Sequence, residues 1–250
     1  MVSIAWALSK LRFPLSVELG GTGKNYDARK GYIEGLELTY VGAQAITVGT
    51  GVACVNGVLL EVADPIPLTG IVTAANTFYH VYLYSNAGVA TVEYSSVAPV
   101  LYKGTAYQKT GDPTRRYLAS FLSLAANTIA RFVQYGNRIV YMESGSAAPF
   151  VLVNSAVINA QTVPTSGMAP VTATYVSAQF FNIATDTNAR VGNPDFQAPV
   201  SAASHLFFVA GGAAILFDMP LSSARTFQWR HDGAANGVFT VRSSGYIFNR

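Results

Sequence analysis

Three histidines and one cysteine are the side chains of this sequence best suited to metal binding, and they are scattered along it. His80, His205 and His231 stand singly, and Cys54 is the only thiol. A structural zinc site needs four closely spaced nitrogen or sulfur ligands. His231 beside Asp232 leaves open a site shared between subunits on a three-fold axis, although such a pair is more typical of a solvated turn. We therefore predict no metal and no cofactor.

A glycine-rich run, GGTGK, invites comparison with the phosphate-binding loop of nucleotide-binding proteins. That loop needs a glycine, four residues, Gly-Lys, and then a serine or threonine that holds magnesium. Here Glu18 occupies the first position and Asn25 the last, so a carboxylate would face the phosphates. We interpret the glycines Gly20, Gly21 and Gly23 as a flexible hinge instead.

The carboxylates are also too dispersed to predict catalysis. A glycan-cleaving site needs two carboxylates about 5 to 9.5 Å apart, and the thirteen acidic residues are spread over 250 positions. Asp186, Asp195 and Asp218 lie near predicted turns, where an aspartate side chain caps its own backbone. No Gly-x-Ser-x-Gly sequence marks a serine nucleophile. We predict that the chain is not an enzyme, and a glycan depolymerase remains only a second alternative.

The composition predicts extensive contact with neighbouring protein. Only 12% of the residues are charged and half are hydrophobic, which is about half the charge of an average soluble protein. Such a chain has little with which to cover a free surface, so we predict a homo-oligomer. Its fourteen tyrosines and fourteen phenylalanines suit interfaces and the stacking of sugars. The candidate receptor contacts are Phe181, Asn193, Phe196, Trp229 and His231, with burial in the core or in an oligomer interface as the alternative.

The basic residues are too thinly spread for nucleic acid binding, which needs a basic stripe. The net charge is +3, and the densest basic group is Arg115 and Arg116. Neighbouring residues of a strand point to opposite faces, so one arginine should face outward and the other inward. The inward arginine needs a carboxylate partner, for which Glu93 and Asp112 are the candidates.

The apolar segments are too short for a membrane or a secretion signal. No run approaches the roughly 18 to 20 apolar residues that a spanning helix requires, so we predict no membrane insertion. Residues 2–8 are apolar, but no basic region precedes them, and Lys10 and Arg12 follow. We therefore expect no signal peptide. The single cysteine fits a protein made in a reducing cytoplasm.

Short runs rich in valine, threonine, tyrosine and phenylalanine predict an all-β fold of two β-sandwich (jelly-roll-like) domains after an N-terminal arm. Asn56-Gly57 is typical of a type I′ hairpin turn, and prolines 65 and 67 limit their strand to a sheet edge. Residues 27–38 could form one short helix at most. The predicted strands cover residues 38–41, 45–48, 53–55, 58–60, 78–84, 89–94, 115–122, 130–135, 139–142, 150–153, 171–181, 205–210, 213–217, 226–230 and 238–242.

The chain divides into three predicted parts. Residues 1–25 are a docking arm, with the first strand of the domain as the alternative reading. Residues 26–145 are an attachment and oligomerisation domain, and residues 146–250 are a distal domain that is a candidate for receptor binding. The boundary is the small, polar segment ESGSAAP, residues 143–149. The arm's anchors for docking to the virion are Trp6, Leu8, Leu11 and Phe13.

Several stretches resemble tailed-bacteriophage virion proteins of the tail fibre and appendage type. LGGTGKN (19–25) looks like a segment near fibre domain junctions. FYHVYLY (78–84), GTA (104–106) and TGDPTRRYL (110–118) are similar to phage domains with an aromatic strand, a turn and a "TGD-x-x-RRY" strand. The ending RSSGY (242–246) faintly resembles the last strand of such proteins. Apart from this ending, the resemblance covers roughly residues 15 to 140.

The resemblance implies a homo-oligomer, often a trimer, located in the virion and attached to other virion proteins, here through the arm. Many such proteins carry a distal domain that recognises a host-surface glycan or protein. Because no long shaft is present, the alternatives are a head fibre or a capsid decoration (cement) protein. The expected function is host-surface adhesion by a structural protein of the particle.

Overall fold

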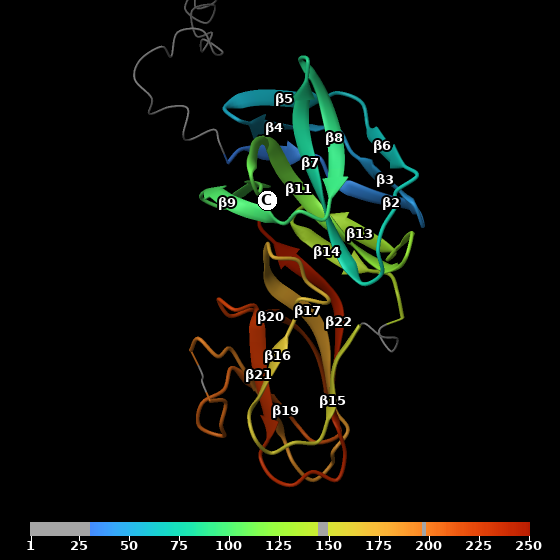
Figure 1. Cartoon of the computed structure of the whole chain (residues 1–250). Helices are drawn as coiled ribbons and strands as arrows, with labels where there is room; N and C mark the ends of the chain where they lie inside the picture. Colours follow the sequence, from blue (N-terminus) through green and yellow to red (C-terminus); the bar gives the residue numbers. More distant parts are fainter. Residues whose placement is uncertain (1–30, 145–149, 197–198) are drawn as a thin grey trace, which may run out of the picture.

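The computed structural model describes residues 31–144, 150–196 and 199–250, which form two stacked lobes built from β-strands (Figure 1). No helix occurs among these residues, which confirms the predicted all-β, sandwich-type fold. None of the described elements is a helix long and apolar enough to cross a membrane.

The strands alternate with short turns along the whole described chain. They are β1 Ile33–Gly35, β2 Leu38–Gly42, β3 Ala45–Val48, β4 Gly51–Val55, β5 Val58–Val62, β6 Ile66–Thr69, β7 Thr77–Asn86, β8 Val89–Ser95, β9 Pro99–Lys103, β10 Ala106–Lys109, β11 Asp112–Ala125, β12 Thr128–Ile129, β13 Phe132–Tyr135, β14 Arg138–Tyr141, β15 Val151–Ser155, β16 Gln161–Pro164, β17 Ala173–Asn182, β18 Ala189–Gly192, β19 Phe207–Val209, β20 Ala214–Pro220, β21 Thr226–His231 and β22 Phe239–Phe248.

Local turn chemistry explains why the hairpins were predictable. Asn56 and Gly57 join β4 to β5 with φ of 46° and 84°, and two positive φ values are what a type I′ turn requires. Ala87 and Gly88 join β7 to β8 in the same way, with φ of 50° and 88°. Strand β6, with Pro67 in it, lies at the end of its sheet as predicted.

The short helix expected within residues 27–38 is wrong in its described part. Ile33–Gly35 is strand β1, which pairs with β4. The backbone then passes through Gly35 and Leu36 with φ of 65° and 59°, values that a right-handed helix does not allow. Gly35 also lies so close to Gly51 that a Cβ atom would be 3.0 Å from the Gly51 Cα.

Each lobe encloses its own apolar core. The upper lobe combines the three-stranded sheet β1-β4-β5, the six-stranded sheet β8-β7-β11-β10-β9 with β12, and part of a nine-stranded sheet. In the lower lobe, strands β20, β17 and β22 of the nine-stranded sheet pack against the four-stranded sheet β16-β21-β18-β19. Phe180, Phe227, Trp229 and Phe239 fill the space between these two sheets.

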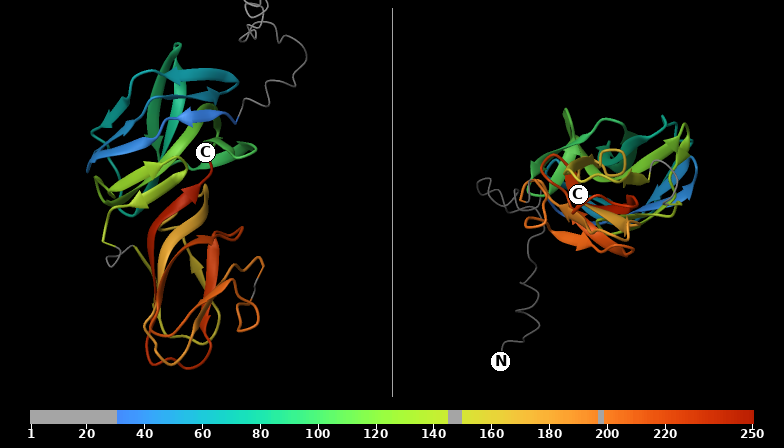
Figure 2. Two further views of the ribbon diagram at one scale, coloured as in Figure 1. Left: turned by 180° about the vertical axis from the view of Figure 1, so that it is seen from behind. Right: turned by 90° about the horizontal axis from the view of Figure 1, so that it is seen from below.

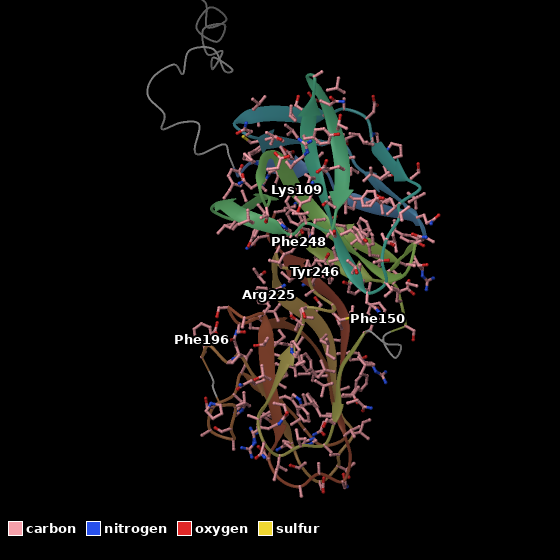
Figure 3. The ribbon with its side chains drawn as sticks, viewed as in Figure 1. Lys109, Phe150, Phe196, Arg225, Tyr246 and Phe248 are labelled. Atoms are coloured by element: carbon pink, nitrogen blue, oxygen red, sulfur yellow. The ribbon has the colours of Figure 1, made fainter. Side chains whose placement is uncertain are left out.

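The nine-stranded sheet runs through both lobes. Its order is β20-β17-β22-β14-β13-β2-β3-β6, with β15 also paired to β22. Strands β22 and β17 rise out of the lower lobe, and β22 pairs with β14 of the upper lobe (Figure 2). Tyr246 and Phe248, at the end of β22, therefore lie in the upper core together with Phe150 (Figure 3). The upper core thus contains residues from both sides of the segment 143–149.

A buried polar network lies where the lobes meet. The Ser120 Oγ is 2.7 Å from the His80 Nδ1 and 2.8 Å from the Tyr117 hydroxyl, which is 2.9 Å from the Thr172 Oγ1. The Tyr246 hydroxyl donates to the Ser120 carbonyl at 2.7 Å. Because these hydroxyls and the His80 Nδ1 each meet a partner, the network ties β7, β11 and β22 together.

The two adjacent arginines lie on opposite faces of the strand, as predicted. The carboxylates expected to pair with the inward arginine instead pair with the outward one. The outer one, Arg115, lies 3.2 Å from a Glu93 oxygen and 3.8 Å from an Asp112 oxygen. The inner one, Arg116, is 1% exposed. Its guanidinium donates to the carbonyl oxygens of Tyr107 at 3.0 Å and of Gly31 at 3.3 Å, so backbone oxygens take the place of the expected carboxylate.

Some predicted features lie outside the described residues. These are the docking anchors Trp6, Leu8, Leu11 and Phe13, the hinge glycines Gly20, Gly21 and Gly23, and most of the polar boundary segment.

Candidate functional site

Three of the five candidate receptor contacts are core residues, which corrects the sequence interpretation. Trp229 is 1% exposed, His231 0% and Asn193 3%. Residues 227, 229 and 231 point inward because β21 alternates between a buried and a solvent-facing side. Trp229 and His231 lie side by side, with ring centroids 5.3 Å apart. Burial lowers the pKa of His231, as is usual for a histidine inside a core.

The other two candidates remain at the surface. Phe181 is half-buried on β17, and the Arg242 guanidinium lies 5.2 Å from the centre of its ring. Phe196 is 81% exposed and lies on the loop after β18 (Figure 3). The neighbouring Asp195 accepts a hydrogen bond from the Ser223 backbone amide at 2.7 Å, which ties this loop to the turn before β21.

The outward side of the four-stranded sheet carries a compact group that sequence reasoning did not assemble. Arg190 on β18 pairs in register with Arg230 on β21 and with Phe208 on β19. Because the intervening residues of each strand fill the core, these three side chains lie on the outer face. With His205 and Asp232 they form what we call the β18 face.

Arg190 is the centre of the β18 face and is held from several sides. Its Nε lies 2.9 Å from each Asp232 carboxylate oxygen, and its second terminal nitrogen donates to Oδ2 at 2.7 Å. Its other terminal nitrogen donates to the His205 Nε2 at 3.0 Å. The Phe208 ring centre lies 5.0 Å from the guanidinium carbon. Hydrogen bonding from Arg190 holds the pKa of Asp232 below its usual range.

Arg230 gives the β18 face its net positive charge. Its Nε donates to the His231 carbonyl at 2.9 Å, and no carboxylate of the described residues forms an ion pair with it. Asp232 compensates the charge of Arg190. One guanidinium charge therefore remains on this face, on the other side of Arg190 from the Phe208 ring, which is 51% exposed.

This arrangement suits the binding of a polar, ring-shaped ligand. An exposed aromatic ring provides an apolar platform, and fixed guanidinium and carboxylate groups present several hydrogen-bonding atoms in one orientation. The Asp232 and Arg190 side chains are 24% and 16% exposed, so part of each remains in contact with solvent. A saccharide, with an apolar ring face and hydroxyl groups at its rim, matches this chemistry.

A shallow groove of about 230 Å³ lies elsewhere in the lower lobe. It lies between strands β15 and β16, and Trp229 borders it. These strands are the edges of the two packed sheets. The groove therefore reaches the core at Trp229, but it contains no charged side chain that would orient a ligand.

Within the described ranges, the histidine-serine pair that resembles a base and its nucleophile, His80 and Ser120, is buried inside the protein. His80 and Ser120 are 4% and 0% exposed, so a substrate cannot reach them in the folded state. Among the described residues no three histidine, cysteine or acidic side chains gather to hold a metal ion.

Sequence reasoning missed Arg190, His205 and Phe208 as partners because they are brought together by strand pairing. Arginine alternates with apolar residues in β18 and β21, and this pattern in the sequence could have shown that the arginines lie on the outer face of the sheet. No family model matches the chain, and no curated relative was found for it.

Proposed function

We propose that this protein is a structural component of a tailed-bacteriophage virion, of the tail fibre or appendage type, that contributes to adhesion to the host surface. Its contact with the host is the β18 face, and its ligand is a surface glycan. The N-terminal arm attaches it to other virion proteins. The motifs between residues 19 and 118 support the virion assignment, and the geometry of the β18 face supports adhesion.

The observation that carries the adhesive role is the rigid placement of Arg190 beside an exposed ring. Two hydrogen-bonded partners and a ring contact fix the guanidinium before a ligand arrives. Little side-chain entropy is then lost on binding. One such site binds weakly, but several copies on a particle bind together with a much greater avidity.

Truncating the ring tests the assignment. We expect Phe208→Ala to weaken glycan binding about tenfold, equivalent to about 1.4 kcal/mol, because the sugar loses its apolar platform. The measurement is binding of the purified full chain to an array of bacterial capsular and lipopolysaccharide glycans, followed by titration of the best ligand. Phe208 is half exposed, so the fold should keep its melting temperature within a few degrees.

Phe196→Ala is the matched control. Phe196 is the more exposed phenylalanine and was itself a receptor candidate, but it lies outside the β18 face. We expect unchanged binding in this variant. Equal losses in both variants, or loss only in Phe196→Ala, would place the ligand elsewhere. A chain that binds no glycan at all would favour the capsid decoration alternative.

A further inference from the structure

Strand pairing places two arginines directly opposite each other on the outer side of the four-stranded sheet. Arg190 of β18 and Arg230 of β21 are partners in the register of that antiparallel pair, and both are half-buried. A guanidinium in a protein is always charged, and like charges directly opposite each other destabilise a pair of strands. The arginine pair therefore reduces folding stability, so the fold does not explain its presence.

A single carboxylate serves both arginines. Asp232 accepts hydrogen bonds from the Nε and a terminal nitrogen of Arg190. Its pKa is lowered first by those hydrogen bonds and also by the positive charge of Arg230. His205 accepts a hydrogen bond from Arg190 through Nε2, so it adds no charge in this arrangement. These four side chains therefore carry one uncompensated positive charge.

The terminal nitrogens of Arg230 are open to an acceptor from outside the chain. The Nε donates to the His231 carbonyl at 2.9 Å, and among the described residues no hydrogen bond or ion pair involves the two terminal nitrogens. The other three acidic residues of the segment 150–250 accept hydrogen bonds from other parts of the lobe; they are Asp186, Asp195 and Asp218. The missing acceptor is therefore one that a ligand can bring.

The strand order fixes where that acceptor must lie relative to the aromatic platform. Phe208 of β19 and Arg230 of β21 are both in register with Arg190, on its opposite sides. Their backbones are therefore two strand spacings apart, about 9.5 Å. A ligand that stacks on Phe208 and also reaches Arg230 has to extend across Arg190. A single sugar ring is too short for this, and two linked sugars are long enough.

We propose that the β18 face binds an acidic glycan, with one sugar stacked on Phe208 and the carboxylate of the adjoining sugar bound to Arg230. This inference rests on the proposed adhesive function and names the class of glycan. A guanidinium presents two parallel N–H groups that match the two oxygens of a planar carboxylate. The charge of the ligand also offsets the repulsion between Arg190 and Arg230, so binding relieves a cost that the free protein carries.

Matched forms of the same polysaccharide test the charge without any mutation. The full chain is bound to an array of bacterial capsular polysaccharides, in which each uronic acid polymer is present in its native form and after reduction of its carboxyl groups to alcohols. We expect the native form of the best ligand to bind about tenfold more tightly than the reduced form. That ratio should shrink as salt is raised from about 0.05 M to about 0.5 M, because salt screens partly exposed charges.

Arginine variants locate the effect. Arg230→Gln should lower the ratio of native to reduced binding from about tenfold to less than about twofold, since the guanidinium that holds the carboxylate is gone. Arg242→Gln is the matched control. Arg242 is also half-buried and its guanidinium lies 5.2 Å from the centre of a phenylalanine ring, that of Phe181, but it belongs to β22 of the other sheet. This variant should keep the tenfold ratio.

Several outcomes would overturn the inference. They are equal binding of native and reduced polymers, a preference for phosphate-bearing polysaccharides, an undiminished ratio in Arg230→Gln, and an equal decrease in both variants. Binding of neutral polysaccharides that Phe208→Ala weakens would leave the adhesive function standing and refute the acidic ligand alone. Binding to no polysaccharide would remove both.

Discussion

Replacing Gly245 with alanine should destabilise the protein by about 3 kcal/mol or more, as measured by urea denaturation. Gly245 lies in β22 opposite Val140 of β14, with φ of 156°. A Cβ atom there would lie 2.1 Å from the Ile139 carbonyl oxygen. The Ile139 carbonyl and the Gly245 Cα that would carry the new Cβ both belong to paired backbone, so neither can move aside without separating β22 from β14.

The effect should be large because this strand pair joins the two lobes. Moving β22 away from β14 also disturbs Tyr246 and Phe248, which are fully buried in the upper core. Gly42→Ala is the control, since a Cβ atom at Gly42 of β2 meets no atom within 4 Å. We expect that change to stay within about 0.5 kcal/mol. Similar destabilisation in both variants would show that crowding at Gly245 is not the cause.

Acidification should remove about 3 kcal/mol of folding stability between pH 6.5 and pH 4 through His80. Burial lowers the pKa of His80 to about 4, whereas an unfolded histidine has a pKa of about 6.5. Between these values the unfolded chain binds a proton that the folded chain does not. Stability is therefore complete above pH 6.5 and declines as the pH falls, by about 1.4 kcal/mol per pH unit.

The test is the pH dependence of the unfolding free energy in His80→Asn. This variant lacks the titrating group, so it should lose less stability than the wild type between pH 6.5 and pH 4, by about 3 kcal/mol. The comparison uses the slope with pH, which separates the titration from any constant cost of disturbing the Ser120 hydrogen bond. The same slope in both proteins would contradict a buried neutral His80. The slope that remains should come from His231, whose pKa burial also lowers, and near pH 4 from the carboxylates whose pKa is lowered in the folded state, Asp112, Glu143, Asp218 and Asp232.

The sequence by itself determined the all-β class, many of the strands and the tight turns, whereas strands β9, β10, β16 and β18 were not predicted. The hairpin at Asn56-Gly57 and the strand Ala45–Val48 follow from the preferences of a few adjacent residues. Proline at position 67 likewise restricted its strand to an edge through the missing amide hydrogen. Each of these features depends on local backbone chemistry, so a single sequence is sufficient to predict it.

Only the tertiary structure decided which face of each strand is buried. In β21 the sequence shows that residues 226–231 alternate between two faces. It does not show whether the odd-numbered or the even-numbered residues face the core, and a one-residue change of register would exchange the two faces. Trp229 and His231 consequently looked like surface contacts, whereas Arg190 and Phe208 form the exposed group. Arg116 shows the same limit, because the carbonyl oxygens that hold it come from Tyr107 and from Gly31, 85 positions away.

Long-range pairing was likewise decided by the tertiary structure alone. The last strand, β22, joins β14 about a hundred residues earlier in the chain and carries Tyr246 and Phe248 into the upper core. Antiparallel strands pair through backbone groups that nearly all residues share, so the residues of one strand do not determine which other strand it pairs with. That partner is selected by the packing of complete apolar faces, which exists only once the sheets have assembled.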